Sequence, residues 1–158
     1  WLEGYNNIIV HLSYSLKLSF IDIDSLIVKN TGMNITEIFK KKGEDYFRDI
    51  EEKITLKYLK NINNVISLGG GGFINDKIRK EILTNHFSFW LNWDDLILIR
   101  RIKKSKKRPL AFNSTDQEIR TIIKDRSRIY SNAKFKINCN KLTKTEIVKR
   151  IIKIYELN

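Results

Sequence analysis

The sequence predicts a single α/β domain, residues 1–158, with a parallel sheet and helices on both of its faces. Short apolar runs typical of strands alternate with amphipathic stretches typical of helices from residue 18 onward. A chain of 158 residues, 42% of them apolar, is long enough to bury one core. Acidic residues and glycines directly follow two predicted strands, at the edge where ligands bind to an open parallel sheet.

The composition excludes several classes of protein. No apolar stretch approaches the roughly 20 residues of a membrane span, and one cysteine, Cys139, cannot form an intramolecular disulfide framework. The 30 Lys and Arg against 18 Asp and Glu give a net charge of +12. Lys, Ile and Asn are all abundant, which indicates codon bias as readily as a nucleic-acid partner. We expect a cytoplasmic monomer with a small-molecule substrate, no nucleic acid and no membrane partner.

The predicted elements follow from periodicity and from helix-capping residues. Asp24 and Asn92 are expected to cap helices, and Asn34, Thr115 and Thr143 each stand three residues before a glutamate, the pattern of a capping box. Gly43 is expected to separate two helices. The predicted strands are 18–23, 64–68, 86–91 and 134–138, and the predicted helices are 24–30, 34–42, 44–60, 76–84, 92–103, 115–130 and 143–156.

Two segments lie outside this alternation. Residues 1–15 are atypical and predict no element, and Trp1 in place of Met indicates that the true N-terminus is missing. Residues 103–115 are basic, contain Pro109 and predict a mobile lid loop.

The first predicted strand ends in Asp22-x-Asp24, and residues two apart on a strand share a face. One carboxylate could help to hold Mg²⁺ through water while the other accepts a hydroxyl proton. A helix cap beside a solvated acid explains the pair equally simply, and the pair alone favours that interpretation.

Glycines supply the second feature. The chain has seven, and four of them, Gly69 to Gly72, are consecutive after the second strand. Such a run lets a ligand approach bare backbone. A tight strand-to-helix turn is the alternative, but a turn does not require four glycines.

Arginines supply the third feature. Lys outnumbers Arg 21 to 9 in this sequence, so an arginine is more informative where a planar, bidentate donor is needed. Arg48, Arg108 and Arg126 could each bind a carboxylate or a phosphate. Each could also be an ordinary helix-surface residue, and for any one of them alone that interpretation is favoured.

Taken together, these residues resemble the shikimate kinase family from about Leu16 to the C-terminus. Each matching stretch is weak alone, and the order and spacing are specific. The stretches are Phe20–Asp24, Gly32–Phe39, Gly43–Glu44, Phe47–Glu51, Leu68–Gly71, Arg108–Leu110, and Arg126 with Tyr130 and Ala133.

The resemblance implies a P-loop kinase-like, three-layer fold. It also implies transfer of the γ-phosphoryl group of ATP to the 3-hydroxyl of shikimate, with ATP and Mg²⁺ as cofactors. By position, the resemblance implies these roles: Asp24 binds the hydroxyl and acts as base, Asp22 lies beside Mg²⁺, Arg48 and Arg126 bind the shikimate carboxylate, Gly69, Gly70 and Gly71 line the shikimate pocket, Arg108 reaches the ATP phosphates and the transferred phosphoryl group from the lid, and Arg100 lies near the adenine.

The N-terminus departs from the family pattern, which opens with a central strand and a G-x-x-x-x-G-K-[ST] loop. Gly4 aligns with the last glycine of that loop, but Tyr5 stands in place of the lysine and Asn6 in place of the hydroxyl residue. We therefore expect an interrupted sheet and little kinase activity. A truncated or frame-slipped sequence is favoured. A non-catalytic, shikimate-binding module and a kinase for another small acceptor are the alternatives.

Overall fold

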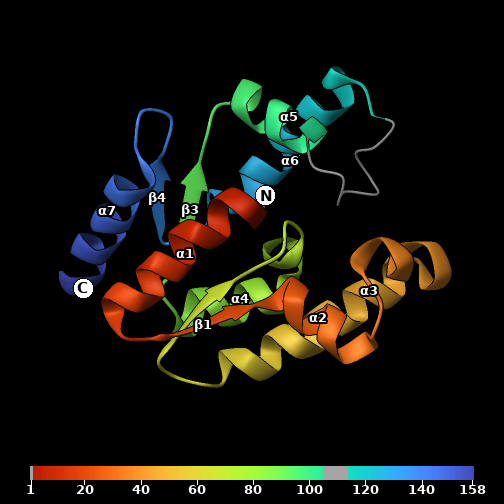
Figure 1. Cartoon of the computed structure of the whole chain (residues 1–158), viewed down its shortest axis with the longest axis horizontal. Helices are drawn as coiled ribbons and strands as arrows, with labels where there is room; N and C mark the ends of the chain where they lie inside the picture. The colour runs from red at the N-terminus through yellow and green to blue at the C-terminus, as the bar shows by residue number, and fades with distance from the viewer. Residues whose placement is uncertain (1, 105–113) are drawn as a thin grey trace.

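The computed structural model describes residues 2–104 and 114–158 (Figure 1). Most of the predicted lid, including Arg108, lies outside these residues. The described elements run in this order: α1 (Leu2–Leu16), β1 (Ser19–Asp22), α2 (Ile23–Thr31), α3 (Ile35–Leu59), β2 (Asn64–Ser67), the 3-10 helix η1 (Gly72–Ile74), α4 (Asp76–Asn85), β3 (Phe89–Asn92), α5 (Asp95–Lys104), α6 (Asp116–Tyr130), β4 (Phe135–Asn138) and α7 (Lys144–Glu156).

The four strands form two separate parallel pairs. β1 pairs with β2 in the register Ser19 to Asn64, and β3 pairs with β4 in the register Phe89 to Phe135. No pairing joins the two pairs within the described residues. The predicted interruption of the sheet is therefore confirmed. In Figure 1, β3, β4, α5 and α6 lie above α1, while β1, α2, α3 and α4 lie below it.

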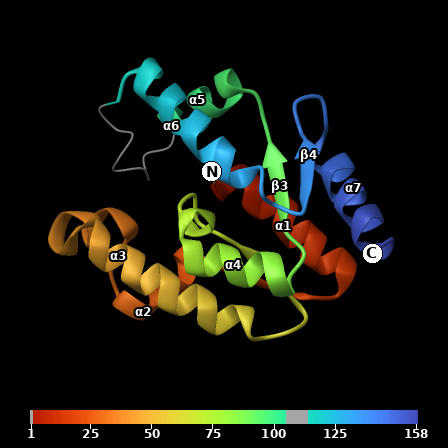
Figure 2. The same ribbon diagram turned by 180° about the vertical axis from the view of Figure 1, so that it is seen from behind.

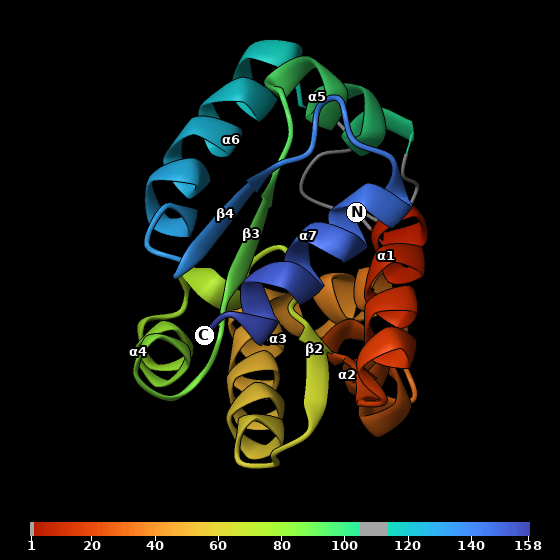
Figure 3. The ribbon, with the colours of Figure 1, turned by 90° about the vertical axis from the view of Figure 1, so that its left-hand side faces the viewer.

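Helices cover both faces of the β1–β2 pair, as predicted. α1 contacts β1 and β2 on one face and packs along α7 (Figure 3). The view from behind has α3 and α4 in front of the same strands (Figure 2). Successive side chains of β2 follow this division, because Val65 packs in the cluster that contains α1 while Ile66 packs with α3 and α4 residues.

The core of the described chain is also divided. One cluster joins α1, α5, α6, β4 and α7, a second joins α2 to α3, and a third lies among α3, η1 and α4. Cys139 is 1% exposed in the first cluster, and burial raises the pKa of its thiol to about 11, as suits a structural residue. Across the described residues, no helix has the length and apolar character needed to cross a membrane.

Capping chemistry confirms three predicted helix starts and corrects two. Asn34, Thr115 and Thr143 each form a capping box with the glutamate three residues on. The cap of α2 is Asp22 and not Asp24, because β1 ends one residue earlier than predicted and the Asp22 carboxylate accepts the Ser25 amide at 3.2 Å.

Asn92 was also wrongly predicted to cap a helix. It is the last residue of β3, paired with Asn138, and the first hydrogen bond of α5 runs from the Leu98 amide to the Asp94 carbonyl. The strand continues past the predicted end because β4 supplies a partner for Asn92, which no local signal reveals.

The N-terminal segment is the largest difference from the predicted elements. Residues 2–16 form one helix, although Gly4 and the run Ile8 to Val10 lower local helix propensity. Ile8 and Leu12, one turn apart, are 3% and 6% exposed against the core. Tertiary burial therefore stabilises a helix that local propensity does not favour.

Candidate functional site

A cavity of about 1270 Å³ opens at the carboxyl ends of β1 and β2 and continues between β2 and β3. Asp24 from the first turn of α2, Arg48 from α3, the glycine run after β2 and Arg126 from α6 all line it. These groups lie far apart in the sequence, so their convergence on one cavity is decided by the fold. Its volume exceeds the roughly 300–1000 Å³ of a small-molecule site.

Arg48 is held in place by two glutamates on its own helix. Its Nη1 donates to Glu51 Oε2 at 2.7 Å, and its Nη2 donates to Glu44 Oε1 at 2.9 Å. Residues three and four apart on a helix share a face, so this arrangement follows from spacing alone. The guanidinium stays partly exposed and faces the cavity.

Glu51 is the most deeply buried acid of the described chain, at 1% exposure. Burial raises the pKa of Glu51, while the hydrogen bond from Arg48 and the charge of Arg126 act against that rise. Burial also disfavours the charged form of Arg48, but the bonds to Glu51 and Glu44 outweigh this and raise the pKa of Arg48. The pair therefore keeps the guanidinium charged beside the cavity.

The glycine run passes so close to these side chains that a β-carbon would not fit. A β-carbon on Gly69 would lie 2.6 Å from Asp24 Oδ1 and 3.1 Å from Glu51 Oε1. A β-carbon on Gly71 would overlap the Arg48 guanidinium. At Gly69 and Gly71 the backbone thus passes close to Asp24, Glu51 and Arg48, and the predicted contact of the run with a ligand stays a prediction.

Two residues of α6 hold the middle of the run. The Gly70 carbonyl accepts Arg126 Nη1 at 3.1 Å and the Tyr130 hydroxyl at 2.5 Å. Both donors come from one face of the helix, since they lie four residues apart. Arg126 thus reaches the cavity from α6, on the side of the molecule that contains β3 and β4. Its hydrogen bond to Gly70 joins that side to the one that contains β1 and β2.

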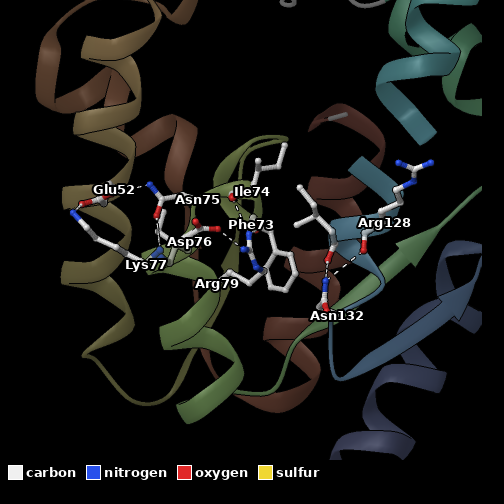
Figure 4. A network of polar contacts seen from close by, with 11 residues as sticks. Glu52, Phe73, Ile74, Asn75, Asp76, Lys77, Arg79, Arg128 and Asn132 are labelled. Carbon is white, nitrogen blue, oxygen red and sulfur yellow. Dashed lines mark hydrogen bonds and ion pairs between the residues drawn. The ribbon is translucent and has the colours of Figure 1, made fainter. Parts of the chain in front are cut away.

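A polar network fixes the far end of the run (Figure 4). Asn75 and Lys77 both donate to the Glu52 carboxylate, at 2.7 and 2.8 Å, which joins the start of α4 to α3. Arg79 donates to the carbonyls of Phe73 and Ile74 in η1, at 3.2 and 2.8 Å. The glycine run is therefore anchored at a rigid turn and does not behave as a free loop.

The arrangement is suited to a small hydroxylated anion. Two guanidinium groups offer bidentate donors for a carboxylate, and the Asp24 carboxylate can accept a hydroxyl proton. The glycines add no side chains to this part of the cavity wall.

Two predicted cofactor residues are not brought to this cavity. Asp22 is 8% exposed and caps α2, and no group of three or more metal-binding side chains is found among the described residues. Arg100 is exposed on α5 and is not part of the cavity lining. Its neighbour Arg101 lines the cavity instead and lies over the Trp93 ring at 4.8 Å.

Sequence reasoning assigned no role to Glu51 and Tyr130, although both stand in the stretches that carry the resemblance. The signal for Glu51 was its place three residues after Arg48 on a helix. Nothing local distinguishes Tyr130, because its partner lies 60 residues away.

Fold and site define an α/β protein with an anion- and hydroxyl-binding cavity at the carboxyl ends of parallel strands. Comparison with known proteins identifies the family. The family model described as shikimate kinase matches residues 7–156. The chain belongs to the shikimate kinase family, whose members are ATP-dependent kinases of aromatic amino acid biosynthesis.

Named relatives agree with this assignment. The chain is 37% identical over 139 residues to a shikimate kinase of Bartonella henselae, covering 87% of this chain and 66% of that relative. It is 35% identical over 142 residues to a shikimate kinase of Thermodesulfovibrio yellowstonii, covering 89% of this chain and 82% of the relative. The chain thus spans about two thirds of the length of the first relative.

Solved structures match the fold closely. The structure of Acinetobacter baumannii shikimate kinase in complex with shikimate has a TM-score of 0.91 at 25% identity, covering 98% of this chain and 88% of that one. The shikimate kinase of Aquifex aeolicus has a TM-score of 0.84 at 33% identity, covering 94% and 88%. The two strand pairs are therefore arranged as in these solved relatives.

Proposed function

We propose that this chain binds shikimate in the cavity at the carboxyl ends of β1 and β2 and presents its 3-hydroxyl for phosphorylation. The observation that carries the proposal is the convergence of Asp24, Arg48, Arg126 and the glycine run on one cavity. The Acinetobacter baumannii relative, solved with shikimate, supports the choice of ligand.

Each of these residues has a distinct task. Arg48 and Arg126 bind the carboxylate and so fix the orientation of the ring. Asp24 accepts a hydrogen bond from the hydroxyl and then its proton, because its carboxylate lies beside Gly69 in the wall of the same cavity. Glu51 touches Arg48 and acts through it, as a positioning residue.

ATP supplies the phosphoryl group in this family, but the described residues do not form a cradle for its phosphates. The segment that aligns with the Gly-Lys loop of the family is helical from Leu2 onward. Asp22 caps a helix, and among residues 2–104 and 114–158 no group of three or more metal-binding side chains is found. The described residues thus supply candidate groups for the acid, while the nucleotide part of the proposal rests on the family.

The proposal predicts that shikimate raises the melting temperature of the chain and that Arg48→Lys removes most of this shift. A lysine loses the bidentate contact, which costs about 1.5–3 kcal/mol and weakens affinity about tenfold or more. Thermal denaturation with and without shikimate measures the effect.

Arg128→Lys is the matched control, because Arg128 is exposed on α6. It should leave the shift unchanged. An equal shift in wild type and Arg48→Lys would refute the assignment of the carboxylate clamp.

The non-catalytic alternative makes the same binding prediction and differs in turnover. An ATP-coupled assay on residues 1–158 that shows turnover typical of a kinase would exclude it. Binding without turnover would support it for this stretch of chain. Mg²⁺ dependence, the monomeric state and the cytoplasmic location stay predictions.

A further inference from the structure

Arg126 and Arg48 reach the same cavity, but different groups hold them. The Arg48 guanidinium donates to the carboxylates of Glu51 and Glu44 on its own helix. Arg126 forms no ion pair within the described chain, and its Nη1 donates to the backbone carbonyl of Gly70 at 3.1 Å. The direction of the Arg126 guanidinium therefore depends on the direction of the Gly70 carbonyl.

Gly70 does not fix the direction of its own carbonyl, because a residue without a β-carbon rotates easily about its backbone. The turn after β2 is held by other backbone bonds. The Gly72 amide donates to the Gly69 carbonyl at 3.1 Å, and the Ile74 amide donates to the Gly71 carbonyl at 2.9 Å. No backbone amide of the described residues donates to the Gly70 carbonyl, which accepts instead from side chains of α6.

Tyr130 is the more rigid of the two α6 donors. Its hydroxyl donates to the Gly70 carbonyl at 2.5 Å, a shorter bond than that from Arg126. The Tyr130 ring lies 6.4 Å from the Phe73 ring and 6.2 Å from the Trp90 ring, between centroids. A tyrosine has two side-chain torsions, and packing restricts them, whereas an arginine keeps far more rotamer freedom. Tyr130 is therefore suited to fix the carbonyl, and Arg126 is suited to follow it.

We propose that Tyr130 is a positioning residue for acid binding: its hydroxyl fixes the Gly70 carbonyl, and this carbonyl orients the Arg126 guanidinium for the carboxylate of the substrate. The inference rests on the proposed function, which assigns that carboxylate to Arg48 and Arg126. Tyr130 and Arg126 lie four residues apart on α6, so one helix face brings both donors to the same carbonyl oxygen.

The energetic consequence is a preorganised Arg126. A guanidinium that is oriented before the ligand arrives loses less conformational freedom on binding, which favours affinity. Without the Tyr130 hydroxyl, the Gly70 carbonyl turns with the glycine backbone, and Arg126 loses its fixed acceptor. Arg48 is unaffected, because its glutamate partners lie on α3.

The first test needs no ligand. Tyr130→Phe removes the hydroxyl and keeps the ring that packs near Phe73 and Trp90. In NMR relaxation measurements on residues 1–158, the order parameter of the Arg126 Nε–H group should fall below about 0.6, the range of flexible groups. The Arg48 Nε–H group is the internal control, since it donates to Glu44 at 3.2 Å and should keep its order parameter.

Tyr14→Phe is the matched control variant, because Tyr14 is 87% exposed on α1. It should leave the order parameters of Arg48 and Arg126 unchanged. An Arg126 order parameter that is the same in wild type and in Tyr130→Phe would overturn the proposal. An equal fall at Arg48 and Arg126 would also overturn it, because it would mean that the substitution loosens the site as a whole.

The second test is calorimetric titration with shikimate in a double-mutant cycle. Tyr130→Phe should weaken affinity about fivefold, the effect of one lost hydrogen bond. In an Arg126→Lys background the same substitution should change affinity by less than about twofold, because the hydroxyl acts through Arg126. Equal losses in the two backgrounds would indicate a structural role of Tyr130 that is independent of Arg126, and would refute the inference.

The cycle also separates this inference from the proposed function. A wild-type chain that does not bind shikimate would overturn both. Binding by wild type with unchanged affinity in Tyr130→Phe would overturn the role of Tyr130 and leave the proposed function in place.

Discussion

Arg48 is oriented before any ligand arrives, because Glu44 and Glu51 bind its guanidinium from the same helix. A side chain held in this way loses little conformational freedom on binding, which favours affinity. The cost is a buried carboxylate, Glu51, whose Oε1 makes no hydrogen bond among the described residues.

Replacement of Gly71 by alanine should weaken shikimate binding without unfolding the chain. The new β-carbon would overlap the Arg48 guanidinium, which is the flexible end of a side chain and can move aside. Affinity should fall about tenfold, the effect of one misplaced charged donor, as measured by calorimetric titration.

Gly72→Ala is the matched control, since its β-carbon would meet Leu68 Cβ at an ordinary 3.5 Å. Equal affinity losses in Gly71→Ala and Gly72→Ala would mean that the close approach to Arg48 is irrelevant.

Glu51 should make stability depend on pH in an unusual direction. Burial raises the pKa of Glu51 above its ordinary value of 4.5, so the folded state holds this proton more tightly than the unfolded state. Its contribution is then present below pH 4.5 and is lost as pH rises through the folded-state pKa. The free energy of unfolding of wild type relative to Glu51→Gln should therefore fall as pH rises from about 4 to about 7.

Glu52→Gln provides a comparison in which the pH dependence of stability has the opposite sign. Hydrogen bonds from Lys77 and Asn75 lower the pKa of Glu52, so its contribution is present above the ordinary pKa and is lost as pH falls. Urea denaturation from about pH 2 to about pH 7 measures both differences. The same slope for the two variants would contradict the buried state of Glu51.

Among the elements, α3 shows how one residue sets the direction of a site helix. Gly43 has φ 85° and ψ 173°, and the two helical parts of α3 meet there at a kink. The second part then carries Glu44, Arg48 and Glu51 along one face toward the cavity. Without the kink at Gly43, this face of the second part would not be directed at the cavity.

Gly43→Ala should destabilise the chain by about 1–3 kcal/mol, because its backbone conformation is one that side chains rarely adopt. No atom lies near the new β-carbon, so the loss is conformational and not steric. Lys40→Ala, at an exposed helical position nearby, should change stability by less than about 0.5 kcal/mol. Chemical denaturation measures both variants, and equal effects would exclude strain at Gly43.

At the scale of the whole molecule, two half-sheets and three core clusters are joined across a large cavity. The larger contacts between the halves come from α1, which touches β2 and α7, and from α6, which touches η1. The cooperativity of unfolding depends on these contacts, since each half of the molecule has its own apolar cluster.

We expect residues 1–158 alone to melt below about 45 °C, the lower end of the range for mesophilic domains, in a broad transition. Unfilled space between the strands forfeits packing and leaves backbone groups unpaired. Circular dichroism at increasing temperature measures this. A sharp transition above about 60 °C would show that the divided core costs little.

The sequence alone determined the alternation of strands and helices, the three capping boxes, the break in the helix at Gly43, and a set of candidate residues that line one cavity. These follow from short-range chemistry: side-chain periodicity, caps that satisfy amides three residues away, and the freedom of glycine. It also showed that the N-terminal segment lacks the expected loop.

Tertiary structure decided the rest, because the partners are distant in sequence. α1 is helical since Ile8 and Leu12 are buried against other elements, and Asn92 stays in β3 since Asn138 pairs with it. Tyr130 holds Gly70 across 60 residues of sequence. The cavity between β2 and β3 forms only once the two strand pairs face each other, a relation that no local pattern encodes.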